Sequence, residues 1–193
     1  MIRSAEPKDI GAMLDIYDDY ILDTCFTFEY EVPSLEDFAG RVAKTQQQYP
    51  WLVAEIDGKV IGYAYAGAPF ARAAYQWNVE LSIYLDGKYH HKGVGTALYS
   101  CLAELLDAQG YHNLFAVITS ENEKSLALTK TLGFVQEGSY KDVGFKLGRW
   151  LDVIWLSKRI KTAGSMPIMP IPFTQLDKNF VLSVFTKYAE LAI

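Results

Sequence analysis

Residues 79–98 read VELSIYLDGKYHHKGVGTAL and predict a strand, a turn and the start of a helix. Apolar residues occupy every second position from Val79 to Leu85, which is the period of a half-buried strand. The dipeptide Asp86-Gly87 then favours a turn. After Gly95 the apolar positions recur at helical spacing, at Ala97, Leu98, Leu102, Leu105 and Leu106.

Two glycines, Gly93 and Gly95, stand at the predicted start of this helix. Glycine lets a ligand approach the backbone closely, and the first N–H groups of a helix have no partner within the helix. A phosphate or pyrophosphate could therefore bind there, beside His90, His91 and Lys92. The same glycines would also suit a purely structural turn, and neither the Walker pattern nor the dinucleotide fingerprint fits this stretch.

Length and composition indicate one globular domain with a sizeable core, since half of the 193 residues are hydrophobic and 21% are charged. The net charge of −5 argues against a nucleic-acid partner. The sequence has neither a signal-peptide pattern nor an apolar run long enough to span a membrane, so we expect a cytoplasmic protein without a membrane partner. Cys25 and Cys101 are too few for a disulfide framework and are expected to be buried thiols.

The rest of the pattern predicts a mixed α/β order of elements. Ser34 is a predicted helix cap, Asp57-Gly58 a hairpin turn, and Ser120–Glu123 has the spacing of a capping box. The expected order is a strand at 2–5, a helix after Pro7, a loop at 21–31, a helix from 35, strands at 51–56 and 59–66, the central strand and helix, a strand at 114–119, a helix to 132, and strands at 134–141 and 150–156.

The composition changes at Lys161, where prolines begin to recur. Pro167, Pro170 and Pro172 indicate an extended linker, and residues 177–193 regain helical spacing. We therefore divide the chain into a domain at 1–160 and a linker with a C-terminal helix at 161–193. The pattern leaves open whether this helix packs on its own domain or on a second subunit.

The central stretch resembles the signature Q/R-x-x-G-x-G/A of the GNAT family of N-acetyltransferases, with His90 at the position of Gln or Arg. The segments NEKS at 122–125 and LGF at 132–134 resemble two further parts of the family pattern. Residues 68–85 and 138–155 resemble phosphinothricin and methionine sulfoximine acetyltransferases. The resemblance implies the acyl-CoA N-acyltransferase fold, in which a mixed sheet with a splayed central strand is flanked by helices.

The resemblance also implies acetyl-CoA as co-substrate, without a metal. We expect its pyrophosphate on the N–H groups at the helix start and its pantetheine amides on the backbone of the central strand. The N–H of Tyr84 or Leu85 could bind the carbonyl oxygen as charge develops on it. The expected coenzyme-binding residues are Ile83, Tyr84, Leu85, His91, Lys92, Gly93, Val94, Gly95, Thr96, Asn122 and Ser125.

Glu80 is the candidate base, because it lies on the polar side of an otherwise apolar strand. Burial would raise the pKa of its carboxyl and suit it to proton transfer, whereas a solvated Glu80 would have no such role. The family often has a tyrosine seven residues after the asparagine, where this chain has Thr129. An aliphatic hydroxyl is too weak an acid, so Tyr140 or solvent is expected to protonate the leaving thiolate.

The resemblance further implies that the acceptor-binding residues are Phe28, Glu29, Arg72 and Tyr75. Phe28 belongs to an aromatic loop that could equally plug the core, and Arg72 could bind a carboxylate or remain solvated. We predict acetyl transfer to a small-molecule amine, an amino-acid analogue such as phosphinothricin or methionine sulfoximine, by a homodimer. The alternatives are another amine (an antibiotic, a polyamine or a protein N-terminus) or a non-catalytic acyl-CoA sensor.

Overall fold

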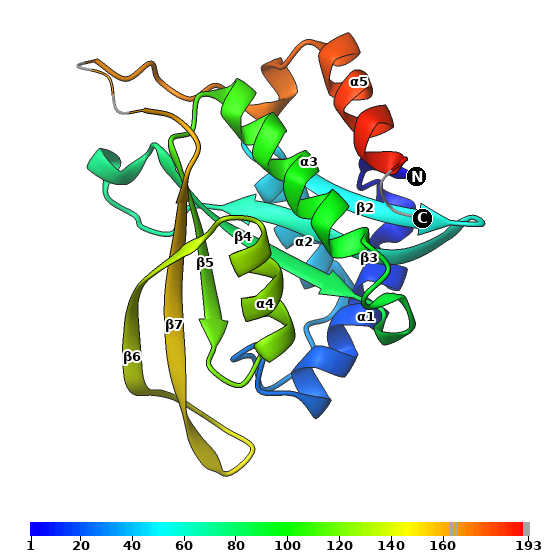
Figure 1. Cartoon of the computed structure of the whole chain (residues 1–193). Coiled ribbons are helices and arrows are strands. Elements are labelled where there is room, and N and C mark those ends of the chain that lie inside the picture. The colour runs from blue at the N-terminus through cyan, green and yellow to red at the C-terminus, as the bar shows by residue number, and fades with distance from the viewer. Residues whose placement is uncertain (163, 165, 191–193) are drawn as a thin grey trace.

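The computed structural model describes residues 1–162, 164 and 166–190. These residues form a seven-stranded sheet with helices on both faces (Figure 1). The strand order is β1-β2-β3-β4-β5-β7-β6, and the pairing of β4 with β5 is parallel while the other pairings are antiparallel. The mixed α/β architecture predicted from the sequence is therefore confirmed.

The elements follow each other along the chain as strand, two helices, hairpin, and then alternating strands and helices. They are β1 (Ile2–Ser4), η1 (Pro7–Asp9), α1 (Ile10–Asp23), α2 (Leu35–Gln46), β2 (Trp51–Ile56), β3 (Lys59–Gly67), η2 (Ala73–Tyr75), β4 (Asn78–Leu85), η3 (Gly87–Tyr89), α3 (Val94–Gln109), β5 (Asn113–Thr119), α4 (Glu123–Thr131), β6 (Val135–Lys146), β7 (Arg149–Arg159), η4 (Phe173–Gln175) and α5 (Lys178–Ala189).

Two hydrophobic cores lie on opposite faces of the sheet because side chains alternate along each strand. On one face, Trp51, Val53 and Tyr63 pack under α1 and α2. On the other face, Leu52 and Ala64 belong to the core that α3 and α5 cover. Figure 1 shows α3, α4 and α5 in front of the sheet and α1 and α2 behind it.

The central strand β4 separates from β5 after a short stretch of pairing. Within the described part of the chain, the two strands pair only from Asn78 to Glu80, with Asn113 to Phe115 as partners. On its other edge β4 pairs with β3 along Glu80–Leu85. The two strands diverge visibly in Figure 1. The splayed central strand that the family resemblance implied is therefore present.

Some predicted boundaries are wrong. Helix α1 continues to Asp23 and shortens the predicted loop at 21–31, because Ile21 is buried in the core beneath it. The last two strands are longer than the sequence indicated and meet at a turn where Leu147 and Gly148 have φ of 51° and 77°. Their cross-strand pairing, which the sequence pattern does not reveal, extends them beyond the alternating segments.

The cap of α4 also differs from the prediction. The side chain of Asn122 accepts a hydrogen bond from the N–H of Ser125 at 3.2 Å, so Asn122 is the cap, and the box predicted at Ser120–Glu123 is not used. The cap predicted at Ser34 is confirmed, since its Oγ accepts a bond from the N–H of Asp37 at 3.1 Å.

The C-terminal helix α5 packs on α3 of its own domain. Val184 and Phe185 are buried in the same core as α3. Lys187 Nζ and Tyr188 Oη both donate to the carboxylate of Glu104, at 2.5 and 2.7 Å. Of the residues that the sequence assigned to this tail, Ala163, Ser165 and 191–193 lie outside the described residues.

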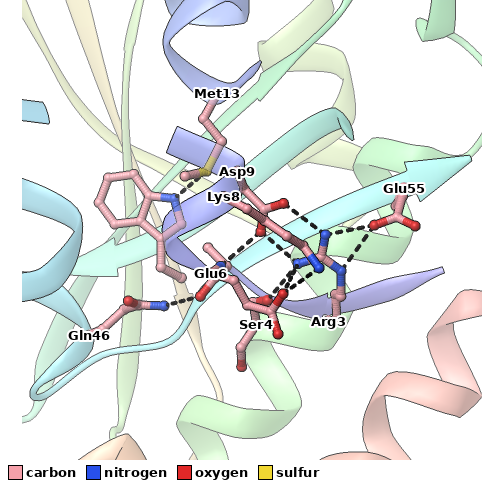
Figure 2. Close-up of polar contacts among 10 residues, drawn as sticks. Arg3, Ser4, Glu6, Lys8, Asp9, Met13, Gln46 and Glu55 are labelled. Atoms are coloured by element: carbon pink, nitrogen blue, oxygen red, sulfur yellow. Dashed lines mark hydrogen bonds and ion pairs between the residues drawn. The ribbon is translucent and has the colours of Figure 1, made fainter. Parts of the chain in front are cut away.

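An ion-pair network near the N-terminus fixes the start of α1 (Figure 2). The Arg3 guanidinium donates to both oxygens of Asp9, at 2.6 and 2.8 Å, and to Glu55 on β2 at 2.6 Å. Asp9 is buried and also accepts a bond from the N–H of Glu6. Burial opposes ionisation of Asp9, but the hydrogen bonds from Arg3 and Glu6 outweigh it and lower the pKa of this carboxyl.

We expect Asp9→Asn to lower the free energy of unfolding by about 2 kcal/mol at neutral pH, because it replaces charge-assisted hydrogen bonds with neutral ones. Since folding lowers the pKa of Asp9 below its usual 3.8, this contribution is complete above that value and is lost as the pH falls through the lowered pKa. Urea titrations of the variant and the wild type across this range measure the difference.

Lys8→Ala is the matched control, because Lys8 pairs with Glu6 in an exposed ion pair. Screened surface pairs contribute little, so its urea midpoint should equal that of the wild type. An Asp9→Asn midpoint equal to that of the control would contradict the stabilising role of the network.

Candidate active site

A cavity of about 430 Å³ lies beside the end of β4 that no longer pairs with β5, at the starts of α3 and α4. Its walls come from α1, β4, the loop before α3, and α4. Most of the predicted coenzyme-binding residues line it: Ile83, Leu85, His91, Gly93, Gly95, Thr96, Asn122 and Ser125. The structure thus brings the central strand and the glycine-bearing helix start together at one cavity.

The helix start forms the polar end of this cavity. His91 and Gly93 have φ of 62° and 80°, and this left-handed backbone leads the chain into α3. The first helical hydrogen bond runs from the N–H of Ala97 to Gly93 O at 2.9 Å. The N–H groups of Val94, Gly95 and Thr96 therefore precede the helical ladder and, with the helix dipole, favour an anion.

Gly95 sits where α3, α4 and β4 meet. A Cβ atom placed on it would lie 3.1 Å from Leu128 Cδ2 and 3.5 Å from Leu85 Cδ1. A larger side chain would have to displace these neighbours and enter the cavity. The second glycine of the motif is therefore needed for close packing at the cavity.

Three predicted coenzyme-binding residues do not line this cavity. The Tyr84 side chain turns to the opposite face of the sheet, where its ring packs edge-on against Tyr17 and Tyr20. Val94 is buried in the core, and Lys92 Nζ lies 4.9 Å from the centre of the Tyr89 ring. The backbone N–H of Tyr84 faces β3, where Tyr84 pairs with Tyr63, so it does not point into the gap between β4 and β5.

Tyr20 is a cavity residue that the sequence analysis missed. Its hydroxyl donates to Leu85 O at 2.8 Å, accepts from Leu85 N at 3.3 Å, and lies 3.2 Å from His90 Nε2. Of the two predicted oxyanion donors, Leu85 thus directs its N–H away from β3 and already has Tyr20 as a partner. The N–H of Tyr84 points to β3, because Tyr84 pairs with Tyr63 and N–H directions alternate along a strand. No local signal could have identified Tyr20, because it precedes Leu85 by 65 residues.

The other missed lining residues come mainly from α4 and from the loop after α1. They are Phe26, Lys124, Ala127, Leu128 and Thr131. His90, which the sequence placed beside the helix start, also lines the cavity. Lys124 Nζ lies 3.4 Å from His90 Nδ1. Burial, together with the charge of Lys124, lowers the pKa of His90, so its imidazole is neutral at pH 7 and Lys124 carries the positive charge.

Glu80 occupies the point where the two strands part. It is the last β4 residue paired with β5, opposite Phe115, and its side chain lies on the face that α1 and α2 partly cover. It is half-buried, and this burial raises the pKa of its carboxyl above the usual 4.5. A raised pKa makes this carboxylate a better proton acceptor than a solvated one.

An aromatic group lies beside Glu80 on the same face, made of Phe70, Tyr75, Phe115, Tyr140 and Trp155. The Phe70 ring is 4.7 Å from Tyr75 and 5.8 Å from Trp155, and Trp155 is 6.2 Å from Tyr140. Two predicted site residues, Tyr75 and Tyr140, thus belong to one group whose member Phe115 pairs with Glu80. Both tyrosines are exposed.

The remaining predicted acceptor residues lie around this face. Arg72 precedes η2, and its carbonyl accepts from the N–H of Tyr75 at 3.0 Å. The Phe28 ring packs on Gly144, where a Cβ atom would lie 2.3 Å from the ring. Glu29 forms an ion pair with Arg41 at 2.6 Å and lines a second cavity of about 240 Å³.

Thr129 faces away from the cavity. It is fully buried, and its hydroxyl donates to the carbonyl of Ser125, 2.9 Å away, or of Leu126, 3.1 Å away. A hydroxyl engaged in this way in the helix cannot reach a leaving thiolate.

Residues 2–155 match the family model described as acetyltransferase (GNAT) domain. The chain therefore belongs to the GNAT acetyltransferase family, which confirms the resemblance found in the sequence. It is 36% identical to the phosphinothricin N-acetyltransferase of Streptomyces viridochromogenes, over 88% of this chain and 93% of that protein. It is also 36% identical to an L-methionine sulfoximine/L-methionine sulfone acetyltransferase of Pseudomonas paraeruginosa, over 86% of this chain and 98% of the relative.

Solved structures of acetyltransferases are also similar to this chain. The phosphinothricin acetyltransferase of Sinorhizobium meliloti in complex with acetyl-CoA superposes with a TM-score of 0.85 at 36% identity, over 89% of this chain and 94% of that one. An acetyltransferase of Salmonella typhimurium, solved with its cofactor acetyl-CoA, superposes with a TM-score of 0.83 at 30% identity, over 86% of this chain and 96% of that one. No helix among the described residues is long and apolar enough to cross a membrane.

If the start of α3 holds the coenzyme, Gly95→Val should weaken acetyl-CoA binding about tenfold or more, because the added methyl groups compete with Leu128 and with the ligand. Isothermal titration measures the dissociation constant. Gly40→Ala is the control, since a Cβ atom there meets nothing within 4 Å apart from the adjoining backbone of its own helix. Equal affinity in the two variants would contradict this placement.

Proposed function

We propose that this protein transfers the acetyl group of acetyl-CoA to the primary amine of an amino-acid analogue, such as phosphinothricin or methionine sulfoximine. One observation carries the proposal: β4 lines a cavity with an anion-binding helix start on one face of the sheet and carries the half-buried Glu80 on the other, at the point where its pairing with β5 ends. The names of the relatives support the acceptor class.

In this proposal the N–H groups at the start of α3 bind the pyrophosphate, and the gap admits the pantetheine arm with its thioester. Ile83 and Leu85 line the apolar part of this path. Asn122 and Ser125 add polar contacts from the start of α4. The acyl carbon then lies between the two faces of the sheet, where an amine can approach it from the side of Glu80.

The reaction follows from these positions. Glu80 takes a proton from the ammonium, directly or through water, and the free amine attacks the thioester carbon. The N–H of Leu85 exchanges the Tyr20 hydroxyl for the thioester oxygen and binds it as negative charge develops on it. The C–S bond then breaks, and the thiolate takes a proton from Tyr140 or from solvent.

The acceptor lies on the face of the aromatic group. Arg72 pairs with its carboxylate, and Tyr75 packs beside it. Phe28 and Glu29 close the site from the loop after α1. The homodimer and the cytoplasmic location that the sequence predicts stay predictions.

A non-catalytic acyl-CoA sensor is the second candidate, because Thr129 stands where the family often has a tyrosine and Tyr20 occupies the N–H of Leu85. Such a sensor would bind acetyl-CoA without turnover. Transfer to another amine remains an alternative within the enzyme class.

Release of free thiol from acetyl-CoA should rise at least tenfold over the background when phosphinothricin or methionine sulfoximine is added. A thiol-reactive dye measures this rate, and spermidine and an N-terminal peptide test the other acceptor classes. Tight coenzyme binding without release in the presence of any amine would favour the sensor.

Glu80→Gln should lower kcat at neutral pH by about a hundredfold or more, because the amide cannot take the proton, while the affinity for acetyl-CoA changes little. Activity requires the ionised carboxylate, so the wild-type rate should fall as the pH drops through a pKa above 4.5. That acidic limb should be absent from the variant. Glu36→Gln on α2 is the matched control, and equal loss in both would refute the assignment of Glu80 as base.

A further inference from the structure

The second cavity lies between the sheet and the helices α1 and α2, on the same face as Glu80. Aromatic rings form most of its wall, with Trp51 stacked on Tyr65 at 4.0 Å. Arg41 and Glu29 add opposite charges to the wall. The cavity is thus a polar pocket within an aromatic frame, and no step of the proposed reaction uses it.

Arg41 has donors left for a second anion. The described contact of its side chain joins one nitrogen, Nη1, to one oxygen of Glu29 at 2.6 Å, which is an end-on pair. A guanidinium has five N–H donors and can bind a carboxylate or phosphinate through two of them. Both side chains are partly exposed, so the pair can open at a small free-energy cost.

Neutral donors line the same pocket. Burial raises the pKa of Tyr63 well above its ordinary value and that of Tyr65 to about 12, so both phenols keep their protons at neutral pH. Thr45 adds an aliphatic hydroxyl. Such hydroxyls can donate hydrogen bonds to the oxygens of an oxyanion.

The register of β3 and β4 connects this pocket to Glu80. Tyr65 lies opposite Ser82, and Gly67 lies opposite Glu80. Tyr65 and Glu80 are therefore diagonal neighbours on one face, roughly 7 to 8 Å apart by the usual geometry of antiparallel strands. An amino acid with its amine at Glu80 can place the end of a side chain a few bonds long in the pocket.

We propose that this pocket binds an anionic group at the end of the acceptor side chain, with Arg41 as its counter-ion in exchange for Glu29. The inference rests on the proposed function and extends it: the Arg41–Glu29 pair determines how strongly the enzyme prefers an anionic acceptor over an uncharged one of the same shape.

Phosphinothricin and methionine sulfoximine form a matched pair of probes, because the first ends in a methylphosphinate anion and the second in an uncharged sulfoximine of the same length. With Arg41→Gln, kcat/KM for phosphinothricin should fall about tenfold to a hundredfold, and that for methionine sulfoximine by less than about threefold. Glu29→Gln should raise kcat/KM for phosphinothricin relative to that for methionine sulfoximine, because it frees Arg41 from its ion pair.

The melting temperature and the acetyl-CoA affinity of each variant show whether it remains folded. Arg41→Lys keeps the positive charge but cannot donate two parallel hydrogen bonds to one anion. It should therefore retain part of the preference for the anionic acceptor. The role of the pocket would be overturned if Arg41→Gln and Glu29→Gln left the ratio of kcat/KM for the two acceptors unchanged, or if both acceptors lost activity equally. The proposed function would still stand in that case. Wild-type protein that releases no thiol with either compound would overturn both proposals.

Discussion

The end of the parallel pairing between β4 and β5 at Glu80 is the constraint on which the site depends. A backbone group inside a sheet needs a hydrogen-bond partner, and beyond this point β5 no longer supplies one to β4. Tyr20 meets part of this need at Leu85. The amides of a pantetheine arm could meet more of it, so the break in the sheet is also a place where an extended, amide-bearing ligand gains affinity.

The alternation of side chains along β4 gives its two faces different surroundings. Ile83 and Leu85 point to the first cavity, whereas Glu80 lies on the face that holds the aromatic group and the second cavity. In the proposed reaction each face binds a different molecule, and the reacting atoms meet at the edge between them. Because the period of a strand is two, a slip of one residue in the pairing would move Glu80 to the wrong face.

Helix α1 links both cavities to the N-terminus. It supplies Tyr20 to the first cavity and Tyr17 to the second. The pair of half-buried Arg3 and buried Asp9 holds the start of this helix against the sheet. The loop that follows α1 is fixed by Lys146, which is buried and donates to Thr27 O at 2.7 Å. Distant parts of the chain thus set the positions of the walls.

The sequence by itself determined the strand–turn–helix unit, the glycines at the start of α3 and the polar side of β4 that carries Glu80, because periodicity and turn chemistry are local properties. The tertiary structure alone decided that Tyr20 and Lys124 line the first cavity, that Arg41 meets Glu29, and that α5 packs on its own domain. These contacts join residues that are far apart along the chain. Which of them form depends on strand order and helix packing, and a local pattern cannot encode either.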